Sequence, residues 1–284
     1  MSNYWVGPQE FPHSECSEEW VRVSDTVSLR VLSWKPTDEA LHQLDPVVMI
    51  PGWGSLFEGW KPLVAEWVTR RRVLYIETRE KTSARIEQKR MSAKDFSIER
   101  FSKDIAVVLS HYQLKNDFHL FSSSLGSTLL IDSLQRREIH AKSSLFVAPN
   151  EHFKLPLWAR IVIKLPLPIL ALKMMRSITL RAIEKKVKEE GQRIRYRRAL
   201  VEQELVRWRA SARSLIAYAL PKDLSNITVP CGILAAQSDK LHAMDAAKSI
   251  AARIPGAVMI EVPSNQYAHE ADVLVEVEAF HASL

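Results

Sequence analysis

The sequence predicts an α/β protein in which a mostly parallel central sheet is flanked by helices and a helical cap is inserted between two strands. Short apolar runs alternate along the chain with segments of helical periodicity, and such runs are typical of strands buried on both faces of a parallel sheet. One long segment has helical periodicity and no strand pattern. The 284 residues, 46% hydrophobic and 25% charged, fit one domain with an insertion.

The expected elements follow one another in a regular order. Alternating apolar residues predict an opening hairpin from strands 20–23 and 27–34. The core strands expected after it are 46–50, 73–76, 118–121, 145–147, 231–236 and 258–262. The expected helices are 60–68, 98–112, 127–134 and 246–254, with a terminal helix over 270–280. Strand alternating with helix indicates parallel strands joined by crossovers.

Residues 151–218 break this order and predict the helical cap, which leaves 1–150 and 219–284 as the core. The apolar residues at helical spacing are Ile183, Val187, Ile194, Val201, Leu205 and Trp208. They predict a pair of amphipathic basic helices broken near Gly191, with the apolar stripe over the site and the charges facing water. The apolar segment 155–175 is interrupted by Lys, Arg and Pro, so it is not expected to span a membrane.

The positive charge of the chain is concentrated in the cap. Residues 173–213 hold 13 Lys and Arg against 5 Asp and Glu, a local +8, so the remainder carries −2 of the total +6. Without a recognised motif, this distribution argues against nucleic acid as a partner. A contact of the basic cap with a membrane surface or an acidic carrier remains open.

The two cysteines, Cys16 and Cys231, have no metal-ligand spacing and suggest no disulfide framework. The first twenty residues are polar and acidic, without the basic start and apolar run of a secretory signal. A cytoplasmic protein is therefore expected. No metal or organic cofactor is expected either, because the serine chemistry considered below needs none.

A serine cluster lies between the expected strand 118–121 and the expected helix 127–134. A nucleophile on a sharp strand-to-helix turn needs small residues two positions before and two after it. Ser123 has Phe121 and Leu125 at those positions, whereas Ser124 has Ser122 and Gly126. The predicted nucleophile is therefore Ser124.

These residues carry a resemblance to the α/β-hydrolase superfamily. Ser122-x-Ser124-x-Gly126 resembles its nucleophile elbow, with serine in place of the first glycine, and 51–54, Pro-Gly-Trp-Gly, resembles its His-Gly loop. The resemblance implies an oxyanion hole formed by the backbone N–H groups of Trp53 and Leu125. It also implies a substrate pocket that includes the Trp53 side chain and Ser123.

The resemblance further implies an acid and a base that follow Ser124 in the chain. Asp239, just after strand 231–236, matches the strand-then-Asp pattern of the family, with Asp245 and Glu151 as alternatives. The base comes last in this fold. His269 follows one more strand and precedes the terminal helix, whereas His242 lies in the loop of the acid and His281 nearly ends the chain.

The activity implied is that of a carboxylesterase-like serine hydrolase. Ser124 would attack the carbonyl, His269 would take its proton, and Asp239 would orient the imidazole. An apolar cap favours a small-molecule carboxylic ester with a hydrophobic moiety. A thioesterase, lactonase, carbon–carbon bond hydrolase or acyltransferase on the same triad is an alternative, as is a non-catalytic ligand-binding or membrane-surface protein of the same fold.

One loop departs from the family pattern. After strand 73–76 many relatives carry Asp-x-Arg-Gly-x-Gly, whereas this chain has Glu77-Thr78-Arg79-Glu80-Lys81-Thr82 without glycine. This charged stretch, extending through Lys89, Arg90 and Lys94, is expected to be a solvated surface loop.

Overall fold

The structure is a computed structural model that describes residues 9–88, 90–153, 155, 157–165, 168–236 and 244–284. Its centre is one twisted sheet in the order β1-β2-β4-β3-β6-β7-β8-β9, with β5 paired to β2. The strands are β1 (Ser14–Ser24), β2 (Val27–Pro36), β3 (Val47–Ile50), β4 (Val73–Ile76), β5 (Arg85–Ile86), β6 (His119–Ser123), β7 (Ser143–Val147), β8 (Cys231–Ala236) and β9 (Val258–Val262). Strands β4, β8 and β9 have the bounds that the sequence predicts.

The sheet is mostly parallel, as predicted. β1 and β2 form the expected antiparallel hairpin, and β2 also runs antiparallel to β4. Every pairing from β4 through β3, β6, β7 and β8 to β9 is parallel. The carboxyl ends of these strands therefore lie at one edge of the sheet, where the site is expected.

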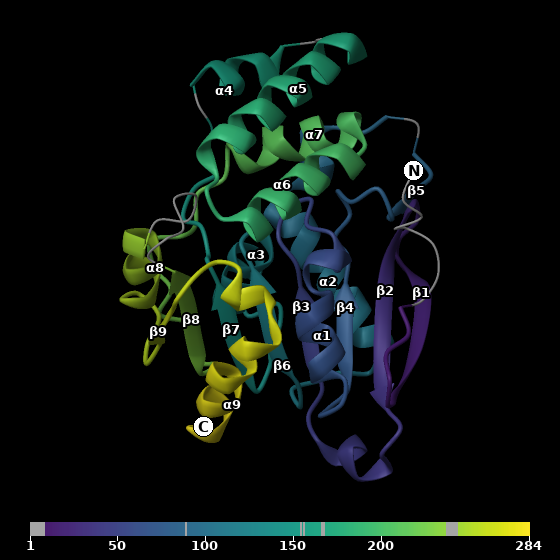
Figure 1. Ribbon diagram of the computed structural model, residues 1–284, viewed down its shortest axis with the longest axis vertical. Coiled ribbons are helices and arrows are strands. Elements are labelled where there is room, and N and C mark those ends of the chain that lie inside the picture. Colours follow the sequence, from purple (N-terminus) through teal and green to yellow (C-terminus); the bar gives the residue numbers. More distant parts are fainter. Residues whose placement is uncertain (1–8, 89, 154, 156, 166–167, 237–243) are drawn as a thin grey trace.

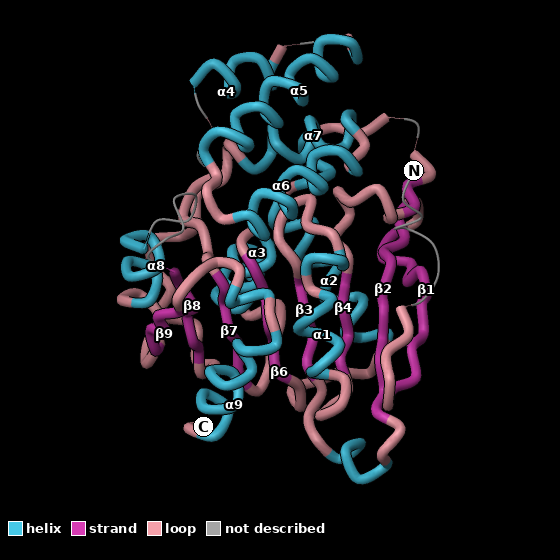
Figure 2. Tube along the Cα trace, viewed as in Figure 1, coloured by secondary structure: helices cyan, strands magenta, loops and turns pink. Residues whose placement is uncertain are grey.

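Helices cover both faces of the sheet (Figures 1 and 2). They are α1 (Lys61–Trp67), α2 (Ile98–His111), α3 (Leu125–Gln135), α8 (Met244–Ala251) and α9 (Leu274–Ala282). Alternate residues of β3 enter two separate cores: Val48 and Ile50 pack with α2, α3 and α8, whereas Val47 and Met49 pack with α1 and α9. The terminal helix begins at Leu274, later than expected, because a 3-10 turn precedes it.

In the described part of the segment between β7 and β8, four cap helices lie above the carboxyl ends of the strands (Figure 1). They are α4 (Leu157–Lys164), α5 (Ile169–Lys186), α6 (Glu190–Glu202) and α7 (Leu205–Leu215). The break expected near Gly191 falls at 187–189 instead, and Gly191 belongs to the first turn of α6. No helix among the described residues is both long and apolar enough to cross a membrane.

The charged loop after β4 is buried over residues 77–81, so its interpretation as a solvated loop is wrong there. The exposed fractions of Glu77, Thr78, Arg79, Glu80 and Lys81 are 3% or less. Burial is tolerated because the charges are paired. The guanidinium of Arg79, for example, donates two hydrogen bonds of 2.5 Å to the carboxylate of Asp104 in α2.

Arg90 and Lys94, farther along the same stretch, are exposed as expected, and Lys89 lies outside the described residues. The partners that allow burial lie on other elements, which explains why local charge density gave the wrong interpretation for 77–81.

Two histidines at the opposite edge of the sheet from the expected site make stability depend on pH. The rings of His119 in β6 and His281 in α9 stack with centroids 3.9 Å apart. Burial, then the charge of Arg71, lowers the pKa of His119 to about 4. Burial, then the charge of His119, lowers the pKa of His281 to about 3. Both values lie below the ordinary 6.5, so the unfolded chain takes up protons first on acidification.

The pair therefore contributes stability at pH 7 that is lost as the pH falls from 6.5 toward 4. Between pH 7 and pH 5 we expect this contribution to fall by about 2 kcal/mol, after allowing for partial exposure. Urea unfolding across this range should show a shallower pH dependence for His281→Leu. The exposed His140 is the matched control, and His140→Leu should keep the wild-type slope. A wild-type slope in His281→Leu would contradict the prediction.

Candidate active site

Ser124 sits on a strained turn between β6 and α3. Its φ is 50° and its ψ is −108°, a conformation that non-glycine residues rarely adopt. A Cβ added at Gly126 would lie 2.2 Å from the carbonyl oxygen of Ile50, so the close approach of α3 to β3 requires glycine there. Ser122 fits the other side, where its Oγ lies 3.1 Å from Ser127 Oγ. This is the geometry that the spacing of small residues predicts.

Asn150, the third residue past the end of β7, donates a hydrogen bond from Nδ2 to Ser124 Oγ at 3.1 Å. Thr128 holds it in place, because Thr128 Oγ1 accepts from the backbone N–H of Asn150 at 3.0 Å. The motifs in the sequence do not point to Asn150; they offer its neighbour Glu151 as an alternative acid. The carboxylate of Glu151 accepts hydrogen bonds from Ser249 at 2.8 Å and Arg253 at 2.6 Å. The sequence feature that could have identified Asn150 is its position shortly after the core strand β7.

His269 ends a short 3-10 helix after β9 and is only 6% exposed. Its ring stacks on Trp60 with centroids 4.0 Å apart, and its Nδ1 lies 2.8 Å from the carbonyl oxygen of Asn265. A carbonyl oxygen can only accept, so this contact assigns the proton to Nδ1. Nε2 is then the nitrogen with a lone pair, which is what a general base requires.

The other predicted acid and base residues are placed as follows. Asp239 and His242 lie outside the described residues. Asp245 is exposed in the first turn of α8, and His281 stacks on His119 at the opposite edge of the sheet. Among the described candidates for the base, His269 is the one beside Ser124 in the same cavity.

The loop expected to form the oxyanion hole runs directly beside Ser124. A Cβ added at Gly52 would lie 3.3 Å from Ser124 Cβ, and Gly54 has a φ of 64°. The backbone of Trp53 therefore passes next to the turn, whose first helical residue is Leu125. The Trp53 ring stacks on Trp208 of α7 with centroids 5.2 Å apart.

A buried ion pair between Lys81 and Glu80 holds this loop in place. Lys81 Nζ donates to the carbonyl of Gly52 at 2.9 Å and lies 3.0 Å from Glu80 Oε1. Glu80 Oε1 also accepts from the backbone N–H of Gly54 at 3.2 Å. From the cap, the side-chain amide of Gln203 donates to the carbonyl of Gly54 at 3.0 Å. Lys81 and Glu80 thus fix the two peptide groups on either side of Trp53, and Gln203 fixes the next one, between Gly54 and Ser55.

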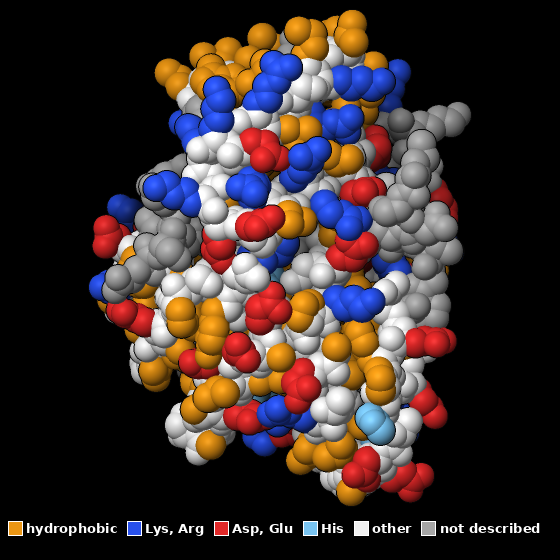
Figure 3. All heavy atoms as spheres, viewed as in Figure 1, with side chains coloured by type: hydrophobic (Ala, Val, Ile, Leu, Met, Phe, Trp, Pro, Cys, Tyr) orange, Lys and Arg blue, Asp and Glu red, His pale blue; other side chains and the backbone are white. Residues whose placement is uncertain are grey.

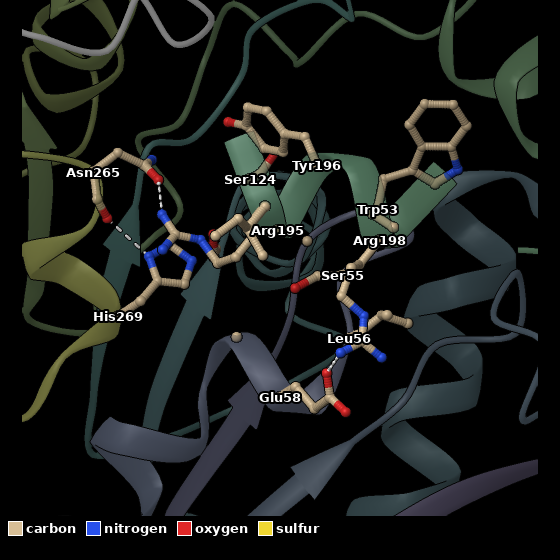
Figure 4. Close-up of a pocket in the computed structure, with 15 residues that line it drawn as sticks. Trp53, Ser55, Leu56, Glu58, Ser124, Arg195, Tyr196, Arg198, Asn265 and His269 are labelled. Atoms are coloured by element: carbon tan, nitrogen blue, oxygen red, sulfur yellow. Dashed lines mark hydrogen bonds and ion pairs between the residues drawn. The ribbon is translucent and has the colours of Figure 1, made fainter. Parts of the chain in front are cut away.

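The cavity at this point has a volume of about 190 Å³ and lies between the core loops and α6 (Figure 4). Ser123, Ser124, Trp53 and His269 line it from the core. The cap contributes the apolar Ile194 and also Arg195, Tyr196, Arg198 and Ala199. The expectation that the cap charges face water is therefore wrong for the two arginines.

Both arginines reach core side chains at the rim of the cavity. Arg195 donates to Asn265 Oδ1 at 2.7 Å, and Arg198 forms an ion pair with Glu58 (Figure 4). Paired partners on the core explain why a charged helix face turns inward. Helical periodicity alone does not reveal these partners, because they are distant in sequence.

The comparisons with known proteins rest on structure. No protein-family model matches the sequence, and neither does any curated protein sequence. An esterase from Exiguobacterium antarcticum superposes with a TM-score of 0.72 at 17% identity, covering 94% of this chain and 100% of that chain. A hydrolase from Pseudomonas aeruginosa superposes with a TM-score of 0.69 at 15% identity, covering 94% of this chain and 96% of that chain.

A naproxen esterase from Bacillus subtilis superposes with a TM-score of 0.67 at 16% identity, covering 96% of this chain and 93% of that chain. These similarities extend over nearly the whole chain. Together with the strand order and the turn at Ser124, they identify the fold of this chain as the α/β-hydrolase fold.

Proposed function

We propose that the chain is a serine hydrolase that cleaves carboxylic esters through an acyl-enzyme intermediate on Ser124. The observation that carries the proposal is the meeting of the strained Ser124, the buried His269 and the loop around Trp53 at one cavity. Esterases and hydrolases among the structural neighbours support the same chemistry.

The proposed mechanism follows from these groups. His269 Nε2 takes the Ser124 hydroxyl proton as Oγ bonds to the ester carbonyl carbon. The backbone N–H groups of Trp53 and Leu125 stabilise the resulting oxyanion. The protonated imidazole then returns the proton to the alcohol as it leaves, and water, activated by the same nitrogen, hydrolyses the acyl-enzyme.

The acid of the triad is proposed from the sequence order. Asp239 follows β8, the strand after the cap, and a carboxylate there stabilises the imidazolium that forms on His269. The carbonyl of Asn265, 2.8 Å from Nδ1, supports the same tautomer. Asn150, which donates to Ser124 Oγ, is proposed to orient the hydroxyl before attack.

The proposed substrate is a small ester with an apolar moiety. Trp53, Leu56, Ile194 and Ala199 give the cavity apolar walls, which supply most of the binding area in such pockets. The polar rim of Arg195 and Arg198 belongs to the cap.

We expect a fluorophosphonate probe to label the wild-type protein with one adduct, which peptide mass spectrometry places on Ser124. Ser124→Ala and His269→Ala should lose the adduct, because one lacks the attacking oxygen and the other the base. Ser110→Ala, at an exposed serine of α2 outside the cavity, is the control and should be labelled like the wild type. Labelling at another residue, or none in the wild type, would overturn the proposal.

Substrate class is tested separately, with p-nitrophenyl esters of increasing acyl length, a thioester and a lactone. We expect turnover of esters to exceed that of the other two. If the thioester or the lactone is turned over faster than the esters, Ser124 stays the proposed nucleophile and the proposed substrate class changes to that compound.

A further inference from the structure

The outer surface of α4 and α5 is apolar, although it faces away from the rest of the molecule. Its members are large hydrophobic side chains with at least 45% of their surface exposed: Leu157, Trp158, Ile161, Leu165, Ile169, Leu170, Met174 and Ile178. They gather at the tip of the cap, where apolar atoms form the crest in Figure 3. We call this set the apolar crest.

The crest is not needed to pack the cap. The inner sides of the same helices already bury Ile163, Leu172 and Met175 against Leu205 and Ala212 of α7. The two helices are thus apolar on both sides, unlike an ordinary surface helix, whose outer side is polar. A contiguous exposed apolar surface of this kind is characteristic of an interaction site.

Basic side chains accompany the crest. Residues 157–188 contain eight Lys and Arg, and their single acidic residue is Glu184. Lys164 and Lys173, on α4 and α5, are exposed, and so is Arg181 farther along α5. In Figure 3 the Lys and Arg atoms lie just below the apolar crest, toward the body of the molecule.

We propose that the apolar crest and its basic border dock the protein on the surface of an anionic lipid bilayer. The arrangement matches the two layers of such a surface: apolar side chains enter the acyl boundary while cations remain at the level of the phosphates. Lys and Arg can reach that level because their aliphatic stems extend along apolar surface. A protein partner would need its own acidic border around an apolar groove, whereas an anionic bilayer supplies both features everywhere.

The packing of the cap sets the orientation. Because the inner sides of α4 and α5 rest on the other cap helices, their outer sides would lie along the membrane plane. The cavity, which α6 lines from the cap, would then lie on the side of the core that is nearest the membrane. An apolar ester dissolved in the bilayer would be held near the cap.

Co-sedimentation with vesicles tests the proposal without reference to catalysis. The wild-type protein should bind vesicles of equal parts phosphatidylcholine and phosphatidylglycerol more strongly than vesicles of phosphatidylcholine alone, and less strongly as salt is raised. The apolar variant combines Leu157→Gln, Ile161→Gln, Leu170→Gln and Met174→Gln. We expect it to lower the partition coefficient at least about tenfold.

The basic variant combines Lys164→Gln, Lys173→Gln and Arg181→Gln. It should lose the preference for anionic vesicles, again about tenfold, and much of the salt dependence. The controls neutralise or polarise exposed residues of the core. They are Lys115→Gln, Lys222→Gln and Lys248→Gln for charge, and Leu44→Gln, Val258→Gln and Val275→Gln for apolar surface. Both controls should bind vesicles like the wild type.

Three results would overturn the proposal: no vesicle binding by the wild type, equal binding by the crest variants, or a wild-type dimer that the apolar variant makes monomeric without any vesicle binding. Hydrolysis of a soluble short-chain ester, measured on all variants, keeps this test separate from the proposed function. It should be unchanged, because no crest residue lines the cavity.

Discussion

Replacing Ser124 by alanine should lower kcat for ester hydrolysis by a factor on the order of 10⁵, because the attacking oxygen is removed. The remaining rate should stay above that of water alone, since the N–H groups proposed for the oxyanion hole, those of Trp53 and Leu125, would still be in place. Initial rates with a p-nitrophenyl ester under saturating conditions measure the effect. Urea unfolding should be little changed, because the hydroxyl lines a cavity rather than the core.

The control for this prediction is the double variant. Ser124 and His269 act as one unit if the proposed mechanism is right, so Ser124→Ala with His269→Ala should be no slower than Ser124→Ala alone. Multiplicative losses in the double variant would show that the two residues act independently, which contradicts the mechanism.

Replacing Lys81 by methionine should lower kcat by about a hundredfold with little change in KM, because the ammonium group holds the carbonyl of Gly52 beside the proposed oxyanion hole. The Glu80 carboxylate would also lose its buried partner, so the free energy of unfolding should fall by about 3–5 kcal/mol. Steady-state kinetics and urea unfolding measure the two effects separately.

Two further variants separate the effect of Lys81 on kcat from its effect on the free energy of unfolding. Glu80→Gln with Lys81→Met removes both charges, so it should recover much of the stability and none of the kcat. Arg30→Met breaks a buried ion pair in β2, where Arg30 Nε lies 2.5 Å from Glu18 Oε1. It should lose stability while keeping kcat. Wild-type kcat in the Glu80→Gln/Lys81→Met variant would refute the role of Lys81.

Strands β3, β4 and β8 could be predicted closely from the sequence because each is a short continuous apolar run. Strand β8 is an example: all six of its residues are buried, and its bounds are those of the run. The turn at Ser124 could be predicted because sterics at two neighbouring positions leave one serine. Both inferences depend on residues close together in the chain.

The supporting residues could not be predicted, because their partners are distant in sequence. Lys81 and Gly52 are separated by 29 positions, and Gln203 and Gly54 by 149. A run of charges is usually solvated, and only the pairing of Glu80 and Lys81 around the Trp53 loop explains their burial. In the same way, helical periodicity could not assign the inner side of α4 and α5, since both sides are apolar.

Gly54 is hydrogen-bonded from both the core and the cap, so the position of the cap is linked to the loop around Trp53. Glu80 in the core binds its N–H, while Gln203, at the turn between α6 and α7, binds its carbonyl. A displacement of that turn away from the core would break the bond to Gln203 and release the peptide between Gly54 and Ser55, whereas Glu80 would still hold the peptide between Trp53 and Gly54. Under the proposed function, access to the cavity and the geometry of the loop that carries the proposed oxyanion hole would therefore be coupled through Gly54.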